Sequence, residues 1–157
     1  PQMADAEAVC EGLPERNDVT FIGLVMNARG ATRALATGRI DQLGAVAVST
    51  DSFAMANQGQ TSDGSVDAAK EIIALSQAAG KTGQVTIGAS FGCPFEGEVA
   101  QDRVVAMAVA LADAGPVEIG LADTIGVGNP AHVAELIARV RDAIARRLLS
   151  SGLRKAE

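Results

Sequence analysis

Four short runs of apolar and β-branched residues recur along the chain, and each is apolar at nearly every position. They cover residues 19–25, 45–49, 85–90 and 117–122. Unbroken apolarity, as opposed to strict alternation, is typical of strands that are buried on both faces of a parallel sheet. The pattern therefore predicts four strands of a covered parallel sheet.

Segments with helical periodicity lie between these runs. One stops at Gly80, which suits the position after a helix, and the last begins at Asn129-Pro130, an N-cap followed by proline at the first helical position. Strand and helix thus alternate, which predicts an α/β fold of parallel βα units with right-handed crossovers. The predicted helices are 67–79, 98–114 and the segment from 130, with shorter ones at 31–37 and ahead of the first strand, ending near Gly12.

Polar residues and glycines gather directly after each predicted strand. These loops are 27–30, 50–53, 92–97 and 123–126. Both doubly wound sheets and (β/α)8 barrels bind their ligands at the carboxyl ends of the strands. The pattern indicates a site at that edge.

Composition narrows the function classes. The chain has 157 residues and a net charge of −6, so it offers nothing to neutralise a row of phosphates, and no nucleic-acid partner is expected. The longest apolar run, 104–112, is far shorter than the ~18 residues of a membrane span, and no signal sequence is visible. Two cysteines make no disulfide framework, which favours a cytoplasmic location.

Asp123 is the strongest candidate for chemistry, because it lies just past a buried strand and precedes Thr124 and two glycines. A carboxylate in that place could bind a cation, orient a metal ligand or hold a substrate hydroxyl. It could equally accept backbone N–H bonds and organise the turn. The residues alone leave both interpretations open.

Other candidates have structural alternatives. Cys93 would need a nearby base to act as a nucleophile, and the single histidine, His132, is expected to face solvent on the last helix. Packing is the favoured role for Cys93 and for Cys10. The polar stretch with Asp51, Ser52 and Asn57 is either a substrate-covering loop or an ordinary capped loop. No dinucleotide fingerprint, phosphate-binding loop or zinc spacing occurs.

Two strings together resemble 3-hydroxy-3-methylglutaryl-CoA lyase and its relatives in the DRE-type TIM-barrel metallolyase superfamily. They are GASFGCPFEGEV (88–99) and LADTIGVGNP (121–130), which are similar to the family's GCPYEG and LGDTIGVG. The string TDSFAMAN (50–57) resembles the family's SESFSKKN, with Ser52, Phe53 and Asn57 matching, and the opening Pro1-Gln2-Met3 is similar to VPQM. The register holds to about Ile144.

The resemblance implies a (β/α)8 barrel that uses a divalent cation, Mg²⁺ or Mn²⁺, to cleave an acyl-CoA into acetyl-CoA and a keto acid. In this chemistry metal and base take a proton from a tertiary hydroxyl, and the cation stabilises the developing carbonyl oxygen. The four predicted strands would be the third to sixth of eight. Asp123, with Thr124, would support the metal site without binding the cation, while Ser52 and Asn57 would lie near the substrate entrance.

The sequence departs from the family in what it lacks. The family's metal ligands, its catalytic Arg and the Cys of its later glycine-rich loop have no counterpart here, so no catalytic residue and no metal ligand is assigned. Cys93 belongs to the earlier GCP loop and does not inherit the catalytic role. The substrate implied by the resemblance is similar to 3-hydroxy-3-methylglutaryl-CoA. Thr86 stands where the family often has Tyr, which leaves room for another 3-hydroxyacyl-CoA as substrate.

A (β/α)8 barrel takes about 250 residues and at least about 200, so four strands predict a partial barrel with two unpaired edges. We expect a lyase domain over residues 1–149 and a fraying polar tail over 150–157. The chain is interpreted as a fragment or truncated form of the lyase, as part of a longer protein, or as a copy that pairs with another. Alternatives are an inactive half-barrel scaffold for self-association or binding, and a related acyl-CoA condensing enzyme. The expected partners are an acyl-CoA and either the missing strands or a second copy, with no membrane.

Overall fold

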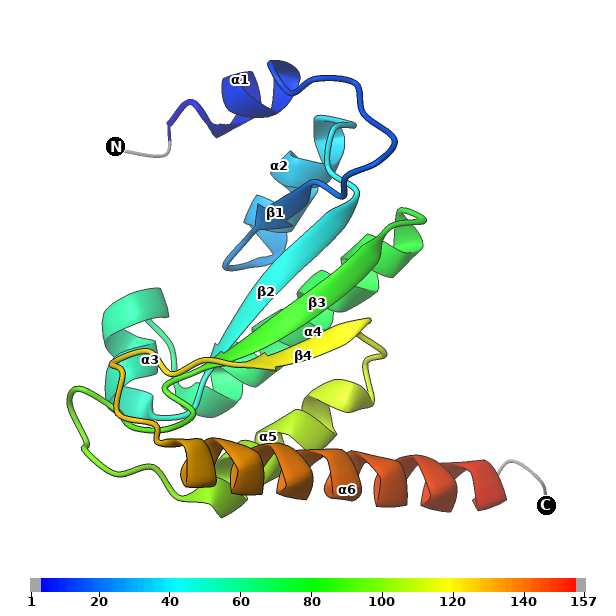
Figure 1. Ribbon diagram of the computed structural model, residues 1–157. Helices are drawn as coiled ribbons and strands as arrows, with labels where there is room; N and C mark the ends of the chain where they lie inside the picture. Colours follow the sequence, from blue (N-terminus) through cyan, green and yellow to red (C-terminus); the bar gives the residue numbers. More distant parts are fainter. Residues whose placement is uncertain (1–3, 155–157) are drawn as a thin grey trace.

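A computed structural model describes residues 4–154 as one run of alternating helices and strands (Figure 1). The elements in chain order are α1 (Ala6–Glu11), β1 (Ile22–Leu24), α2 (Ala28–Ala36), β2 (Gln42–Val48), α3 (Asp51–Gln58), α4 (Ser62–Ala78), β3 (Thr82–Gly88), α5 (Gln101–Ala112), β4 (Glu118–Leu121) and α6 (Pro130–Arg154). Pro1-Gln2-Met3, matched above to the family's VPQM, lie outside the described residues.

The four strands form one sheet in the order β1-β2-β3-β4, and every neighbouring pair is parallel. Helix α4 packs on β2 and β3, and α5 packs on β3 and β4, so these helices cover one face (Figure 1). The other face is open, and β1 and β4 are both free edges within the described residues. The predicted α/β class and the partial barrel are confirmed as an unclosed parallel sheet.

The two faces of the sheet differ in chemistry. Leu43, Val85 and Ile87 point to the covered face and are buried in the hydrophobic core with Ile72 and Leu111. Alternate positions of β2 and β3 carry Gln42, Gln84 and Thr86 on the open face. There the Gln42 side-chain amide donates a hydrogen bond to the Gln84 side-chain oxygen at 2.8 Å. The expectation of strands covered on both faces is therefore wrong for the described part of the chain.

Several element boundaries differ from the predicted ones. Strand β1 keeps only the three residues that pair with β2, whereas β2 and β3 begin three residues earlier than predicted. Helix α4 starts at Ser62, five residues before its predicted start, because the Thr61 side chain accepts a hydrogen bond from the Gly64 N–H at 3.0 Å. Gly80 follows α4 with φ of 70°, as predicted for the residue after a helix.

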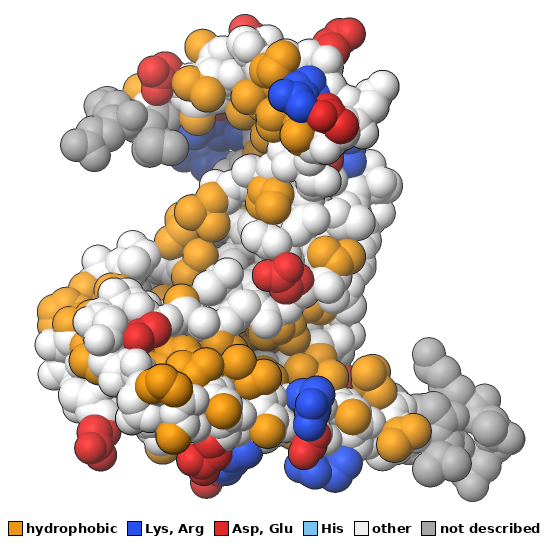
Figure 2. Space-filling model, viewed as in Figure 1, with side chains coloured by type: hydrophobic (Ala, Val, Ile, Leu, Met, Phe, Trp, Pro, Cys, Tyr) orange, Lys and Arg blue, Asp and Glu red, His pale blue; other side chains and the backbone are white. Residues whose placement is uncertain are grey.

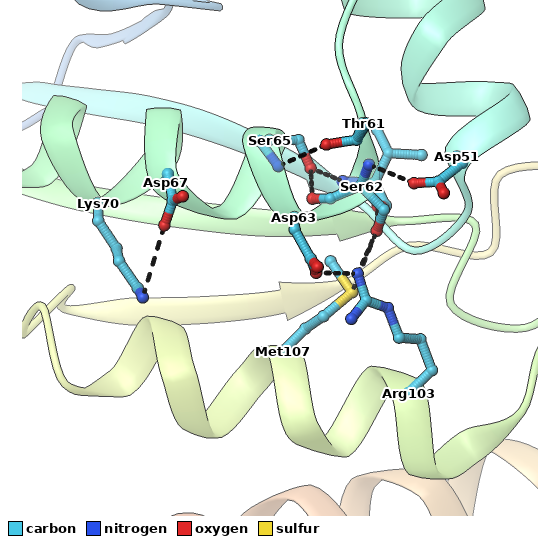
Figure 3. Close-up of polar contacts among 11 residues, drawn as sticks. Asp51, Thr61, Ser62, Asp63, Ser65, Asp67, Lys70, Arg103 and Met107 are labelled. Carbon is cyan, nitrogen blue, oxygen red and sulfur yellow. Dashed lines mark hydrogen bonds and ion pairs between the residues drawn. The ribbon is translucent and has the colours of Figure 1, made fainter.

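The carboxyl end of β2 extends beyond its neighbour β1, and side chains from α4 replace the missing strand there (Figure 3). The Ser65 hydroxyl accepts from the Val48 N–H at 2.9 Å, and the Ser62 hydroxyl donates to the Val48 carbonyl at 2.5 Å. Arg103 of α5 reaches the same Ser62 hydroxyl at 2.6 Å and also pairs with Asp63. This serine cluster fixes the strand end from which the next loop departs.

Replacing Ser62 by alanine is expected to lower the free energy of unfolding by about 1–3 kcal/mol, because the buried Val48 carbonyl loses its partner. Urea unfolding of the purified chain followed by circular dichroism measures the change. Thr32→Ala, which removes an exposed hydroxyl on α2, is the control and should stay within about 0.5 kcal/mol. Equal effects of the two substitutions would contradict the assigned role of Ser62.

Helix α6 begins as predicted, with the Asn129 side chain accepting from the His132 N–H at 2.9 Å. It runs to Arg154, past the predicted boundary at 149, while the proposed division into domain and tail remains a prediction. Arg147 binds both carboxylate oxygens of Asp113 at 3.1 and 3.0 Å, and this hydrogen bonding lowers the pKa of Asp113. No helix among the described residues is long and apolar enough to cross a membrane.

Hydrophobic side chains remain exposed along α6 and where it meets the sheet (Figure 2). A groove of about 500 Å³ lies between β4 and α6, and Ile119, Leu121, Val133, Ile137 and Val140 line it. At the opposite edge of the sheet, Leu24 on β1 is 69% exposed. Both edges therefore expose apolar side chains in the described part of the chain.

Candidate functional site

Asp123 lies in the turn that follows β4, at the carboxyl end of the sheet. Its two carboxylate oxygens accept hydrogen bonds from the backbone N–H groups of Val127 at 3.0 Å and Gly128 at 2.9 Å. The carboxylate thus organises the turn, which is one of the two roles considered for it. The side chain is also exposed, so it stays accessible from the carboxyl edge.

Gly128 allows this close approach. A Cβ atom on Gly128 would lie 3.0 Å from Asp123 Oδ2 and 3.3 Å from the Phe91 ring. Phe91 is buried and cannot easily yield, so any added side chain pushes on the carboxylate.

We expect Gly128→Ala to lower the free energy of unfolding by about 1–3 kcal/mol through overpacking of the turn. Urea unfolding of the purified chain provides the measurement. The matched control is Gly12→Ala, where the added Cβ would meet its nearest atom at an ordinary 3.5 Å. A loss at Gly128 no greater than that at Gly12 would show that the turn has room for a side chain.

The loop after β3 is held by two hydroxyl groups from the segments that follow its neighbouring strands β4 and β2. The Thr124 hydroxyl accepts from the Ala89 N–H at 2.8 Å, and the Ser49 hydroxyl donates to the Ala89 carbonyl at 2.8 Å. Ala89 has φ of 55°, a left-handed conformation that is costly for a residue with a side chain and that concentrates at functional sites. Thr124 therefore fixes the backbone beside Asp123.

Thr86 lies one row deeper on the open face. Its register partner on β4 is Gly120, and a Cβ atom on Gly120 would meet the Thr86 hydroxyl oxygen at 3.2 Å. Asp123 and Thr124 follow the same strand, so the structure gathers three of the predicted site residues along β3 and β4. Their roles in binding remain predictions.

Residues 51–58 form helix α3, so the predicted loop, whether substrate-covering or capped, is wrong for this stretch. The loop after β3 stabilises the first turn of α3, because the Glu96 carboxylate accepts a hydrogen bond from the Ser52 N–H at 2.9 Å. The rings of Phe53 and Phe95 pack with their centroids 5.9 Å apart. Gly59 then ends the helix with φ of 68°. Ser52 is thereby linked to the site through its backbone.

Cys93 is buried, and its contacts hold the loop after β3 together. Its sulfur lies 3.1 Å from the Thr50 hydroxyl oxygen, and its backbone exchanges two hydrogen bonds with Gly97 that close the GCPFEG loop.

Asn57 is exposed near the far end of α3 and is not brought to Asp123 by any described contact. His132 is half-buried and packs edge-on against Phe91, with ring centroids 5.2 Å apart, so it does not simply face solvent.

A pocket of about 570 Å³ lies between the loops that follow β3 and β4. Its lining includes Cys93, Val99, Gln101, Ile125, Val127 and His132. Among the described residues, no three His, Cys, Asp or Glu side chains are grouped so that they could hold a metal ion. The side chains present therefore do not fit a metal site by themselves.

Three residues of this site were not predicted from the sequence: Ser49, Ala89 and Glu96. Glu96 belongs to the predicted site loop 92–97 but was given no role there, and its partner Ser52 is 44 positions away. The strained Ala89 gives no sequence signal, because alanine is not a residue expected at positive φ.

Comparison with known proteins shows which family this chain belongs to. The family model described as HMGL-like matches residues 2–151. Hydroxymethylglutaryl-CoA lyase YngG of Bacillus subtilis is 32% identical over 133 residues, covering 85% of this chain and 44% of the relative. The (R)-citramalyl-CoA lyase of Chloroflexus aurantiacus is 37% identical over 160 residues, covering 92% and 48%. The chain thus spans under half the length of these relatives.

Solved structures agree with the sequence relatives. The HMG-CoA lyase of Bacillus subtilis superposes with a TM-score of 0.83 at 30% identity, over 88% of this chain and 46% of that one. An HMG-CoA lyase of Acinetobacter baumannii, in complex with coenzyme A and 3-methylmalate, superposes with a TM-score of 0.84 at 30% identity, over 92% and 47%. The resemblance drawn from the motifs is confirmed, and the chain belongs to the HMGL-like family.

Proposed function

We propose that this chain forms the middle half of a divalent-metal-dependent acyl-CoA lyase barrel that cleaves a 3-hydroxyacyl-CoA into acetyl-CoA and a keto acid. The carbon–carbon bond next to the tertiary hydroxyl breaks, the hydroxyl loses its proton and becomes the keto group, and the acetyl-CoA carbon gains a proton. The family match over residues 2–151 supports this reaction class. The sequence relatives cited above are lyases by name, which favours cleavage over the condensing reaction.

The observation that carries the proposal is the geometry around Asp123. Its carboxylate is fixed by two backbone N–H groups at the carboxyl end of β4, and Thr124 beside it fixes the end of β3. Ligands of (β/α)8 barrels bind at that end. We infer that these residues hold the substrate end of the barrel in shape.

The described residues do not fit a metal site, so we assign no step through a metal to this chain. The Mg²⁺ or Mn²⁺ that the family implies would take its ligands from strands outside these four. A cytoplasmic location and a homo-oligomeric assembly are further parts of the proposal. The acyl-CoA would be similar to hydroxymethylglutaryl-CoA or citramalyl-CoA, the substrates named for the relatives.

A graft tests the proposal. The full 157-residue chain replaces the matched segment of the Bacillus subtilis lyase, and this protein is called the graft. Acetyl-CoA release is measured with Mg²⁺ or Mn²⁺ and with hydroxymethylglutaryl-CoA or (R)-citramalyl-CoA. We expect metal-dependent release by the graft and none by the 157-residue chain alone.

Circular dichroism and a cooperative thermal transition establish that the graft is folded. A folded graft that releases no acetyl-CoA from either substrate would count against the lyase proposal. Release by the isolated chain would contradict the proposal that the metal ligands lie outside these four strands, because that chain would then hold a complete catalytic set.

A further inference from the structure

One residue at the carboxyl end of β3 interrupts the regular hydrogen bonding between β3 and β4. Ala122 donates its N–H to the Ile87 carbonyl at 3.0 Å, and its own carbonyl accepts from the Ser90 N–H at 3.0 Å. In a regular parallel ladder these two bonds go to residues two positions apart, whereas Ile87 and Ser90 are three apart. Ala89 is therefore an extra residue, a β-bulge of the kind that is common next to active sites.

Two side-chain hydroxyls take the place of the backbone partners that the bulge removes. The Ala89 N–H donates to the Thr124 hydroxyl and the Ala89 carbonyl accepts from the Ser49 hydroxyl, each at 2.8 Å. Ala89 is fully buried, and an unpaired backbone group there would be costly. Because its φ of 55° is also costly for alanine, the bulge depends on these two hydrogen bonds.

Ser49 gives the bulge a fixed support on the side away from Asp123. The Ser49 side chain is buried, and its N–H donates to the Gly88 carbonyl at 3.1 Å. Both backbone groups of the preceding residue, Val48, are bonded by serine hydroxyls of α4. Thr124, in contrast, is exposed and adjoins Asp123 in the turn after β4. The bulge thus connects a rigid, buried hydroxyl on one side to the exposed turn on the other.

We propose that Ser49 is a positioning residue of the lyase site, which acts through the bulge at Ala89 on Thr124 and the Asp123 turn. Its hydroxyl holds the Ala89 carbonyl, and the Ala89 N–H in turn holds the Thr124 hydroxyl. This inference rests on the proposed lyase function and adds a residue to the same site. Loss of the Ser49 hydroxyl leaves the strained peptide held from one side, so Thr124 and the Asp123 turn shift.

The test is Ser49→Ala in the graft, with acetyl-CoA release measured from hydroxymethylglutaryl-CoA and (R)-citramalyl-CoA. We expect kcat to fall by about tenfold or more, because the site loses its geometry. The KM should stay within about twofold, since Ser49 itself is buried and makes no substrate contact in the proposal. Where Ser49→Ala does not fold, Ser49→Cys replaces it as a variant of nearly the same shape with a weaker donor, and the same fall is expected.

Ser76→Ala is the matched control, because it also removes a buried serine hydroxyl that bonds a backbone carbonyl of the same strand. The Ser76 hydroxyl donates to the Thr82 carbonyl at the amino end of β3, far from the Asp123 turn. Both substitutions should lower the midpoint of urea unfolding, but Ser76→Ala should leave kcat within about twofold. An equal loss of kcat in the two variants would mean that Ser49 has only a structural role, and would overturn the inference.

A substitution at Ala89 tests whether the effect passes through the bulge. Glycine adopts positive φ readily, so Ala89→Gly keeps the bulge with less support from Ser49. The loss of kcat caused by Ser49→Ala should then be at least about threefold smaller in the Ala89→Gly background. A loss of the same size in both backgrounds would show that Ser49 does not act through Ala89.

Nuclear magnetic resonance of the 157-residue chain gives a readout that does not depend on the graft. Ser49→Ala should move the backbone amide resonances of Thr124 and Asp123, whereas Ser76→Ala should leave them in place. Unmoved resonances of Thr124 and Asp123 in Ser49→Ala would overturn the inference even where the graft does not fold. An active graft whose kcat is unchanged by Ser49→Ala overturns the inference and leaves the lyase proposal intact. A folded graft that cleaves neither substrate overturns the lyase proposal itself.

Discussion

Asp123→Asn in the graft is expected to lower kcat/KM for acetyl-CoA release by about 10- to 100-fold. The two carboxylate oxygens accept from the Val127 and Gly128 N–H groups, and an amide keeps only one acceptor oxygen for these two donors. One N–H then faces an NH₂ group, and the turn at the carboxyl end of β4 shifts. Steady-state rates with saturating metal measure the loss.

Asp67→Asn is the matched control for this substitution. Asp67 is an exposed carboxylate on α4, on the helix-covered side of the sheet, with one ion-pair contact to Lys70 at 4.0 Å. We expect its rate to stay within about twofold of the graft. If Asp123→Asn changes kcat/KM no more than Asp67→Asn does, the turn has no part in the reaction.

Leu24→Ala is expected to change the free energy of unfolding little in the isolated chain and strongly in the graft. In the isolated chain Leu24 is 69% exposed on the free edge strand β1, so the free energy of unfolding should change by less than about 0.5 kcal/mol. In the graft the preceding strands cover this edge, and the same truncation should cost about 2–4 kcal/mol. Urea unfolding of both proteins measures the two values.

Ile87→Ala serves as the reference for this comparison. Ile87 is fully buried on the helix-covered face, so its truncation should cost about 2–4 kcal/mol in both proteins. A small and equal effect of Leu24→Ala in both proteins would mean that β1 stays at an open edge even when the flanking segments are present.

The features that could be predicted from the sequence are those that depend on near neighbours in the chain. Asn129 caps α6 through the N–H of His132, three positions away, and Gly80 takes the positive φ that ends α4. The four strands were predicted because their runs of apolar and β-branched residues are longer than those of typical loops. Their parallel order followed from the intervening helices.

The features that escaped prediction depend on contacts between distant segments. Helix α3 is anchored through Glu96, 44 positions from Ser52, and Ser62 in the first turn of α4 is held by Val48 and Arg103. Polar positions such as Gln42 and Gln84 were hidden within or beside the apolar runs, so the open face was missed. Asp123 was found because its place after a strand is a local feature, whereas its two N–H partners became visible only in three dimensions.

Amide hydrogen exchange at the two sheet edges tests most directly that these four strands are the middle of a closed barrel. The Val25 N–H donates to Gly44 and the Ala122 N–H to Ile87, so alternation turns the N–H groups of Leu24 and Leu121 toward the free edges. In the graft, exchange at Leu24 and Leu121 is predicted to slow by at least about 100-fold relative to the isolated chain. Equally fast exchange at both residues in a folded graft would contradict the account.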